Sequence, residues 1–136
     1  MDTFFLDVAK LTAKLSHAKR KQVGAVLAKD GRIVSIGYNG TPAGFDNCCE
    51  DVLSDGSLKT KKNVVHAESN ALFFCAKTNI QACGATMYLT LSPCATCALA
   101  LIQSGVSRVV YIEPYTDLEG CRILEAAGVE VEQIVE

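Results

Sequence analysis

Hydrophobic and polar positions follow one another along the chain with periods that change between segments. Near the start, five apolar residues recur at largely helical spacing: Phe4, Leu6, Val8, Leu11 and Leu15. This spacing predicts an amphipathic helix over residues 4–18. Two short apolar runs, at 23–28 and 33–36, flank an Asp30-Gly31 turn signal and predict a β-hairpin. Residues 38–62 are rich in Gly, Asn, Asp and Ser with few periodic apolar positions, so we expect a long loop there.

The second half of the chain alternates between helical and extended patterns. We expect, in order, a helix at 66–77, a strand at 86–91, a helix at 94–103, a strand at 108–112, a helix at 118–127 and a strand at 129–134. This order predicts parallel strands joined by right-handed crossovers. Together with the hairpin it predicts an α/β fold, a three-layer α/β/α sandwich around a five-stranded mixed sheet. At 136 residues the chain is expected to form one domain, residues 1–136.

Composition and charge narrow the class of protein. Hydrophobic residues make up 49% of the chain and charged residues 21%, as in an ordinary globular protein. The net charge is −2 and the basic residues are scattered, which disfavours a nucleic-acid polymer as partner. The apolar runs are shorter than the ~20 residues of a membrane span, and the acidic start does not resemble a signal peptide. With seven cysteines, an odd number, we expect a cytoplasmic protein whose cysteines are thiols or metal ligands.

Two short motifs carry candidate chemistry, and each falls where a helix is expected to begin. They are His66-Ala67-Glu68 and Ser92-Pro93-Cys94-Ala95-Thr96-Cys97. Cys94 and Cys97 lie on one face of a first helical turn, where the helix N-terminus favours the thiolate form that binds metal. His66 is the candidate third ligand. Three protein ligands leave the fourth corner of a zinc tetrahedron for water, as in catalytic sites, whereas structural sites fill all four.

Glu68 favours catalysis over a structural role. Its carboxylate is expected to reach the metal-bound water without ligating the metal, to remove a proton from it and to return protons to the substrate and the leaving group. Two plainer interpretations are a redox dithiol at Cys94 and Cys97, which has no need of His66 and Glu68, and a structural zinc knuckle, which requires a fourth ligand. The combined H-x-E … P-C-x-x-C pattern is the known signature of zinc nucleobase deaminases.

The two candidate metal-binding segments belong to a set of five motifs along the chain. They are Val23-Gly24-Ala25-Val26, Gly37-Tyr38-Asn39-Gly40-Thr41-Pro42-Ala43-Gly44, His66-Ala67-Glu68-Ser69-Asn70-Ala71, Ser92-Pro93-Cys94 and Gln103-Ser104-Gly105-Val106. From about residue 23 to residue 131, the chain thus resembles the deoxycytidylate (dCMP) deaminases, including those of phages. The resemblance implies a cytidine-deaminase-like fold, one Zn²⁺ ion per chain and a homo-oligomer, usually a hexamer. It also implies hydrolysis of dCMP to dUMP and ammonia, which feeds thymidylate synthesis.

The resemblance implies roles for individual residues around the base and the sugar. Asn39 is expected to hydrogen-bond the deoxyribose, and the N–H of Ala67 to hold the pyrimidine carbonyl. The carbonyl of Ser92 is expected to accept a hydrogen bond from the exocyclic amine. Val23 and Pro93, in the same motifs, are also assigned to the substrate pocket.

The phosphate of the substrate requires hydrogen-bond donors. Arg20 and Lys21 lie immediately before the first strand and are the candidates, although a solvated basic segment is the plainer interpretation of each residue taken alone. Tyr115, which follows the penultimate strand, is a candidate wall for the sugar and the phosphate.

Members of the family are commonly activated by dCTP and inhibited by dTTP, bound with a divalent cation between subunits. The resemblance therefore implies a regulatory site, with Mg²⁺ accompanying the triphosphate. Its candidate residues are Gly40, Thr41, Pro42, Gly44, Phe45, Asn70 and Lys77. A glycine-rich turn offers backbone N–H groups to phosphate.

Three other functions are alternatives: a zinc deaminase acting on cytosine, guanine or an adenosine in RNA, a zinc-binding module without turnover, and an interaction protein that uses the long loop. The segment 46–65 contains no histidine, so a second zinc site at Cys48 and Cys49 is not expected. His17 is expected on the surface of the first helix. The remaining cysteines are expected to be small buried hydrophobic residues: Cys75, Cys83 and Cys121.

Overall fold

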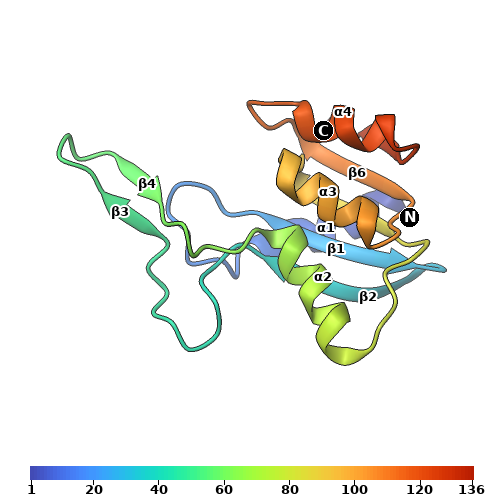
Figure 1. Cartoon of the computed structure of the whole chain (residues 1–136), viewed down its shortest axis with the longest axis horizontal. Coiled ribbons are helices and arrows are strands. Elements are labelled where there is room, and N and C mark those ends of the chain that lie inside the picture. Colours follow the sequence, from blue (N-terminus) through green and yellow to red (C-terminus); the bar gives the residue numbers. More distant parts are fainter.

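The computed structural model describes residues Met1–Glu136 as four helices and seven strands (Figure 1). The helices are α1 (Asp2–Ala13), α2 (Ala67–Thr78), α3 (Ala95–Gln103) and α4 (Glu119–Ala126). The strands are β1 (Gly24–Lys29), β2 (Arg32–Tyr38), β3 (Glu50–Val52), β4 (Leu58–Thr60), β5 (Thr86–Leu91), β6 (Arg108–Glu113) and β7 (Glu130–Gln133). None of the four helices has the length and hydrophobicity that a membrane crossing requires.

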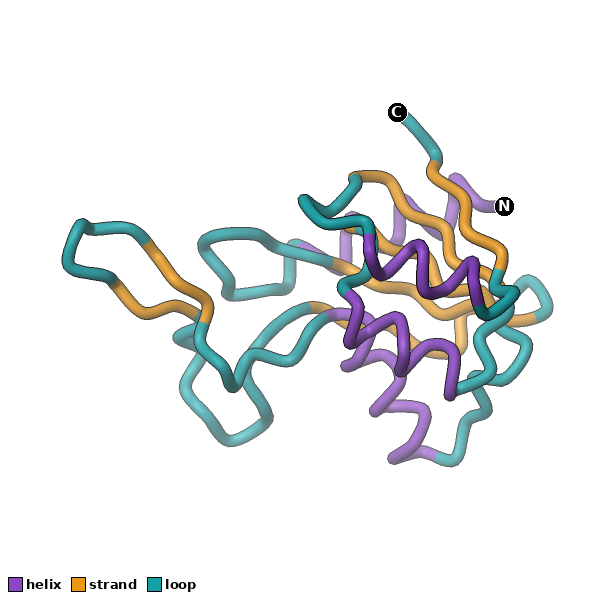
Figure 2. The backbone as a smooth tube through the Cα atoms, turned by 45° about the horizontal axis from the view of Figure 1, so that its top comes forward, coloured by secondary structure: helices purple, strands orange, loops and turns teal.

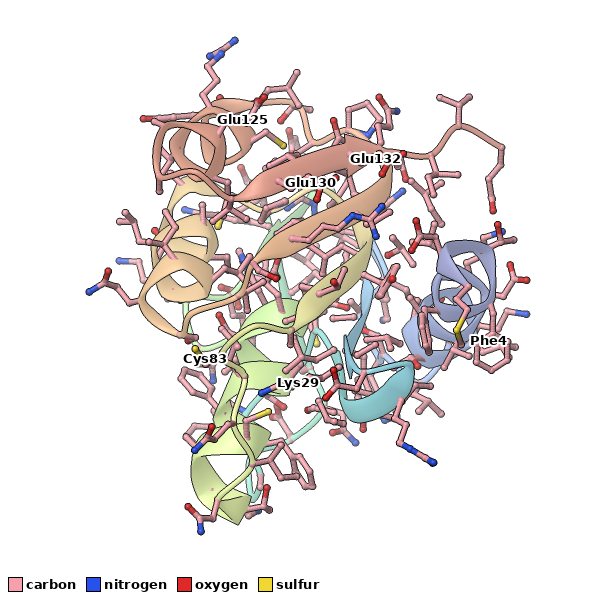
Figure 3. All side chains as sticks on the ribbon, turned by 90° about the vertical axis from the view of Figure 1, so that its right-hand side faces the viewer. Phe4, Lys29, Cys83, Glu125, Glu130 and Glu132 are labelled. Atoms are coloured by element: carbon pink, nitrogen blue, oxygen red, sulfur yellow. The ribbon has the colours of Figure 1, made fainter.

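Five of the strands form one mixed sheet in the order β2-β1-β5-β6-β7. Strand β1 pairs antiparallel with β2 and β5, whereas β5, β6 and β7 run parallel. Helices α2, α3 and α4 cover one face of the sheet and α1 covers the other, which makes three layers (Figure 3). The predicted three-layer α/β/α sandwich with a five-stranded mixed sheet is therefore confirmed.

The central strands separate two hydrophobic cores. Leu27, Met87 and Leu89 belong to the larger core under α2, α3 and α4. Val26 and Tyr88 point to the opposite face and belong to the smaller core under α1. Because successive side chains of a strand point to opposite faces, β1 and β5 are buried on both sides and lack the alternating pattern of a half-exposed strand.

The first helix differs from the sequence-based expectation in length and in its buried face. It ends at Ala13, and its core-facing residues include Phe5, Leu6, Ala9 and Ala13. Of the five apolar residues used for the prediction, Leu6 alone is fully buried, whereas three are exposed: Phe4, Leu11 and Leu15. The physical reason is close packing, because a Cβ atom on Gly24 of β1 would lie 1.9 Å from the carbonyl oxygen of Ala9. The face with small residues therefore lies against the sheet.

The segment 38–62, expected to be a long loop, is loop over most of its length but also contains two short strands. These are β3 and β4, which pair antiparallel and form a two-stranded ribbon that projects from the body of the molecule (Figure 2). The strands have three residues each, too few to show a period of two in the sequence.

Two smaller expectations are also corrected. Cys83 is exposed, whereas Cys75 and Cys121 are buried as expected. His17 is exposed but follows the end of α1, so it is not on the helix itself.

Candidate active site

Three side chains from two helix N-termini converge at one end of the sheet. His66 is the N-cap of α2 and Cys94 is the N-cap of α3, with Cys97 in the first turn of α3. The Nδ1 atom of His66 lies 3.6 Å from the Sγ of Cys94 and 3.3 Å from the Sγ of Cys97. All three ligand atoms lie within 4.8 Å of one another, and they are the one such group of His, Cys, Asp and Glu side chains in the chain.

The spacing of these atoms fits a zinc ion. With Zn–N of about 2.0 Å and Zn–S of about 2.3 Å, a tetrahedral site places its nitrogen and sulfur ligands about 3.5 Å apart. The observed distances of 3.6 Å and 3.3 Å agree with that edge. His66 is exposed, Cys94 is half-buried and Cys97 is buried, so the ligand set is open toward solvent on the histidine side. One nitrogen and two sulfur ligands with an open side match a catalytic zinc site better than a closed structural one.

The electrostatic environment favours a thiolate at this position. Hydrogen bonds with Cys97 and His66 lower the pKa of Cys94 to about 4. The hydrogen bond to Cys94, together with burial, raises the pKa of Cys97, because the two sulfurs share one proton. Contact with Cys94 raises the pKa of His66. The hydroxyl of Ser69 lies 3.4 Å from the Sγ of Cys97, a contact that the sequence analysis missed.

Glu68 lies in the first turn of α2 and is a buried residue, only 4% exposed. Burial raises the pKa of its carboxyl group to about 7. No basic side chain forms an ion pair with it. A buried acid with a pKa near neutrality, beside a metal-binding cluster, is suited to accept and release protons.

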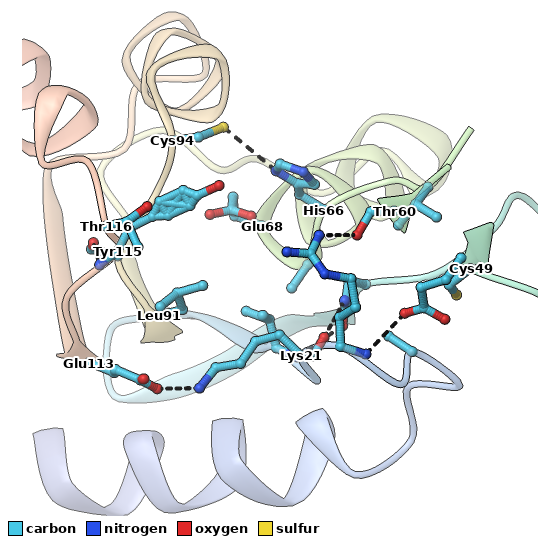
Figure 4. Close-up of a pocket in the computed structure, with 18 of the residues that line it drawn as sticks. Lys21, Cys49, Thr60, His66, Glu68, Leu91, Cys94, Glu113, Tyr115 and Thr116 are labelled. Atoms are coloured by element: carbon cyan, nitrogen blue, oxygen red, sulfur yellow. Dashed lines mark hydrogen bonds and ion pairs between the residues drawn. The ribbon is translucent and has the colours of Figure 1, made fainter. Parts of the chain in front are cut away.

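A cavity of about 350 Å³ opens in front of Glu68 and the ligand cluster (Figure 4). Its walls come from the segment between α1 and β1, the residue that follows β2, the β3–β4 ribbon, the start of α2, and the segments that follow β5 and β6. Of the residues predicted from the sequence, ten line it: Arg20, Lys21, Val23, Asn39, His66, Ala67, Glu68, Ser92, Cys94 and Tyr115. The volume lies within the range of small-molecule sites.

The predicted base-binding and sugar-binding groups adopt defined positions in this cavity. Ala67 is the first residue of α2, so its N–H has no acceptor within the helix and is free for a ligand. The Oδ1 of Asn39 accepts a hydrogen bond from the N–H of Val23 at 2.9 Å, and its Nδ2 donates to the carbonyl of Lys21 at 2.8 Å. These contacts hold the Asn39 amide in place and leave one N–H of Nδ2 free.

The segment after β5 is locked to the segment after β6. The N–H of Ser92 donates to the carbonyl of Glu113 at 2.9 Å, and the hydroxyl of Ser92 accepts from the N–H of Tyr115 at 2.7 Å. The Tyr115 ring points into the cavity (Figure 4). Pro93 is fully buried and does not line the cavity, in contrast to the other residues assigned to substrate binding.

The basic residues at the rim are held by neighbours that the sequence analysis did not identify. Lys21 pairs with Glu113 at 2.5 Å, and Arg20 donates to the hydroxyl of Thr60 at 3.0 Å (Figure 4). The carboxylate of Glu50 accepts hydrogen bonds from the backbone N–H groups of residues 19 and 20, at 2.9 and 3.1 Å. No local sequence signal marks Glu50, because its partners lie about 30 residues away.

A second cavity, of about 480 Å³, lies on the other side of Asn39 and Cys49, which line both cavities. All seven residues assigned to a regulatory site line it: Gly40, Thr41, Pro42, Gly44, Phe45, Asn70 and Lys77. His17 and the exposed rings of Phe73 and Phe74 lie in the same walls. Asn70 also donates a hydrogen bond to the carbonyl of Tyr38 at 2.8 Å, which joins α2 to the end of β2.

Comparison with known proteins agrees with this geometry. Residues 1–113 match the family described as the cytidine and deoxycytidylate deaminase zinc-binding region. The chain therefore belongs to the cytidine and deoxycytidylate deaminase family, a class of zinc-binding hydrolases, and it is an enzyme of that class.

Within the family, the chain is similar to deoxycytidylate deaminases, several of them from phages. It is 37% identical to the deoxycytidylate deaminase of Enterobacteria phage T4, over 93% of this chain and 86% of that protein. It is 40% identical to a probable deoxycytidylate deaminase of Caenorhabditis elegans, over 96% of this chain and 68% of that protein. The dCMP deaminase of cyanophage S-TIM5, solved in complex with dCMP and dUMP, superposes with a TM-score of 0.90 at 41% identity, covering 97% and 95% of the two chains.

Proposed function

We propose that this enzyme hydrolyses dCMP to dUMP and ammonia, with one zinc ion held by His66, Cys94 and Cys97. The observation that carries the proposal is the position of Glu68, buried beside the three ligands and facing a cavity that fits a mononucleotide. The likeness to the S-TIM5 enzyme, solved with dCMP and dUMP, supports this choice of substrate.

The chemistry follows from the protonation of Glu68. A zinc ion at this site supplies a water nucleophile near neutral pH. The Glu68 carboxylate takes a proton from the attacking water and delivers protons to the ring nitrogen and to the departing amine. Water thus adds to the amine-bearing ring carbon, the bond from that carbon to nitrogen breaks, and ammonia leaves. A pKa of about 7 allows one carboxyl group to act as base and then as acid.

The remaining cavity residues orient the substrate in this proposal. The N–H of Ala67 donates to the pyrimidine carbonyl, and the carbonyl of Ser92 accepts from the exocyclic amine. Asn39 uses its free N–H for the deoxyribose, with Val23 and Tyr115 as walls. Pro93 acts through the backbone, since its ring is buried away from the cavity.

Arg20 and Lys21 bind the phosphate in this proposal. Both lie at the rim of the cavity, and their present partners are exposed groups that a phosphate dianion can replace. Loss of either side chain is therefore expected to raise KM for dCMP far more than KM for deoxycytidine.

The direct test is ammonia release from dCMP, CMP, deoxycytidine, cytosine and guanine by the zinc-loaded enzyme. A preference for dCMP is expected, whereas a preference for guanine or cytosine would contradict the assignment. The variant Glu68→Gln is expected to keep its zinc and lose a factor of about 10² to 10⁴ in turnover, since it cannot transfer protons. Glu119→Gln, an exposed position on α4, is the matched control. Half of the wild-type rate in Glu68→Gln would refute the role of the carboxylate.

We also propose that residues 1–136 form a single dCMP deaminase domain that acts in the cytoplasm as a homo-oligomer, a hexamer by family resemblance. Its dUMP product supplies thymidylate synthesis.

We propose in addition that dCTP activates the enzyme and dTTP inhibits it, each bound with Mg²⁺ in the second cavity. The lining of that cavity by all seven assigned residues supports the regulatory part. Sigmoidal dCMP kinetics that dCTP makes hyperbolic are expected, and kinetics indifferent to both triphosphates would contradict it.

A further inference from the structure

The hydroxyl of Ser69 joins the two helices that carry the candidate zinc ligands. Ser69 lies in the first turn of α2, three residues after the N-cap His66. Cys97 lies in the first turn of α3, three residues after the N-cap Cys94. Residues three apart lie on the same face of a helix, so Ser69 faces the ligand cluster together with His66. The Oγ of Ser69 lies 3.4 Å from the Sγ of Cys97.

This hydroxyl does not bond to a carbonyl of its own helix. Serine and threonine hydroxyls within helices often donate to the carbonyl four residues earlier, and Thr12 and Thr78 do so here at 2.8 and 2.6 Å. The carbonyl four residues before Ser69 belongs to Val65, which precedes α2 and accepts a hydrogen bond from the N–H of Gly40 at 3.1 Å. The Ser69 hydroxyl reaches α3 instead.

The two candidate sulfur ligands differ in the donors available to them. The Sγ of Cys94 accepts from the N–H of Cys97 at 3.5 Å, and Cys94 is half-buried, so water reaches it. Cys97 is only 3% exposed, and its Sγ contacts the hydroxyl of Ser69 and the ring of His66, itself a candidate ligand. A cysteine that binds metal is a thiolate and has no proton to give, so Ser69 is the donor of this pair. Without it, a buried negatively charged sulfur would lose a hydrogen bond that water does not easily replace.

We propose that Ser69 is a positioning residue of the zinc site, whose hydroxyl donates to the Cys97 thiolate, fixes the sulfur and withdraws part of its negative charge. The inference rests on the proposed function, because it takes Cys97 as a zinc ligand. Hydrogen bonds from surrounding groups to metal ligands are typically worth about 10- to 100-fold in metal affinity or activity. Ser69 lines neither cavity, so it acts on the reaction through Cys97 and not through the substrate.

The first test is zinc affinity, measured by competition with a chromophoric chelator. Ser69→Ala is expected to weaken zinc binding about 10- to 100-fold, and it favours folding of α2 because alanine has the higher helix propensity. Ser69→Thr keeps the hydroxyl and is expected to bind zinc nearly as tightly as the wild type. Ser69→Val has the shape of threonine without the hydroxyl and is expected to be as weak as Ser69→Ala. Thr78→Ala is the matched control, because it removes from the same helix a hydroxyl that bonds only within that helix.

The second test is the absorption spectrum of the enzyme loaded with Co²⁺ in place of zinc. A thiolate that loses a hydrogen bond holds its lone-pair electrons less tightly, so its charge-transfer band to cobalt moves to longer wavelength. This shift is expected in Ser69→Ala and Ser69→Val, and not in Ser69→Thr or Thr78→Ala. A purely structural role of Ser69 would lower metal affinity without moving the band. With saturating zinc, kcat for dCMP is expected to fall in Ser69→Ala and KM to stay unchanged.

Several results would overturn the proposal. They are a wild-type zinc affinity in Ser69→Ala, an equal loss of affinity in Thr78→Ala, a Ser69→Thr enzyme as weak as Ser69→Val, an unmoved cobalt band, and a rise in KM as the main effect. The comparison of Ser69→Ala with Thr78→Ala stands even if the two larger side chains do not fit. Ratios between variant and wild type test Ser69, whereas the zinc content and the dCMP turnover of the wild type test the proposed function, so the two failures are distinguished.

Discussion

Gly120 packs against the backbone of Pro93 and Cys94, so a change at this glycine is expected to affect both the stability of α4 and the position of a candidate zinc ligand. It is a buried residue in the first turn of α4, and an added Cβ atom would lie 2.1 Å from the carbonyl oxygen of Pro93 and 2.8 Å from the carbonyl carbon of Cys94. Non-bonded contacts below 3.0 Å are essentially never observed at a Cβ atom. In the variant Gly120→Ala, either α4 or the Pro93–Cys94 segment must therefore move by about 1 Å.

The expected effect of Gly120→Ala on the free energy of unfolding is opposite in sign to the effect that helix propensity alone predicts. In a helix without such a neighbour, a change from Gly to Ala stabilises by about 0.5–1 kcal/mol. Overpacking of a rigid backbone contact costs about 1–3 kcal/mol, and here the neighbour is backbone that cannot rotate away. We expect a net loss of about 2 kcal/mol, which for a chain of 136 residues lowers Tm by about 7 °C. A shift of about 1 Å at Cys94 is also expected to lower kcat about 10²-fold.

The assay is thermal unfolding of the zinc-saturated enzyme, with zinc content and dCMP turnover measured on the same samples. Gly40→Ala is the control for stability, because a Cβ atom at that position has no neighbour within 4 Å and its backbone has a negative φ. A Gly120→Ala enzyme that is as stable as the wild type, with full zinc content and turnover, would show that this contact does not constrain the metal site.

Two further predictions follow from the ion pairs and hydrogen bonds. Arg108 and then Tyr88 hydrogen-bond Asp2 and lower its pKa to about 2, so ionised Asp2 stabilises the fold above about pH 4 and this contribution is lost as the pH falls toward 2. Asp2→Asn is expected to cost about 1 kcal/mol at pH 7 in urea unfolding, since a third of the side chain is exposed, and a difference that persists at pH 2 would exclude charge as the cause. Glu50→Ala is expected to raise KM for dCMP about tenfold, because it releases the backbone that carries Arg20, with kcat and the KM for deoxycytidine nearly unchanged. Glu50→Gln is expected to be intermediate, and an equal rise in both KM values would show that Glu50 does not act through the phosphate.

Patterns between residues close together in the sequence were sufficient to predict most elements of this fold. The helices from α2 to α4 have buried positions three and four residues apart in the sequence, and β5 and β6 are short runs of consecutive apolar residues. The candidate zinc ligands are equally local, because Cys94 and Cys97 share one helical turn and Glu68 follows His66 by two residues. Helix α2 and strand β5 separate the two motifs, so the chain runs out along α2 and back along β5, and both motifs reach the same end of the sheet.

Contacts between segments far apart in the sequence decided the features that the sequence did not predict. Two stripes on α1 compete for the sheet, and the close approach of Gly24 to Ala9, rather than the more regular period, selects the one that is buried. The Glu50 carboxylate accepts hydrogen bonds from the backbone N–H groups of residues 19 and 20 only when the β3–β4 ribbon is folded. The sequence does not reveal this ribbon, because β3 and β4 have three residues each and are too short to show a period. The sequence by itself determined the order of most elements and the candidate metal ligands, because both depend on neighbours along the chain. The tertiary structure alone decided which faces are buried and which groups position the cavity rim, because those depend on contacts across tens of residues.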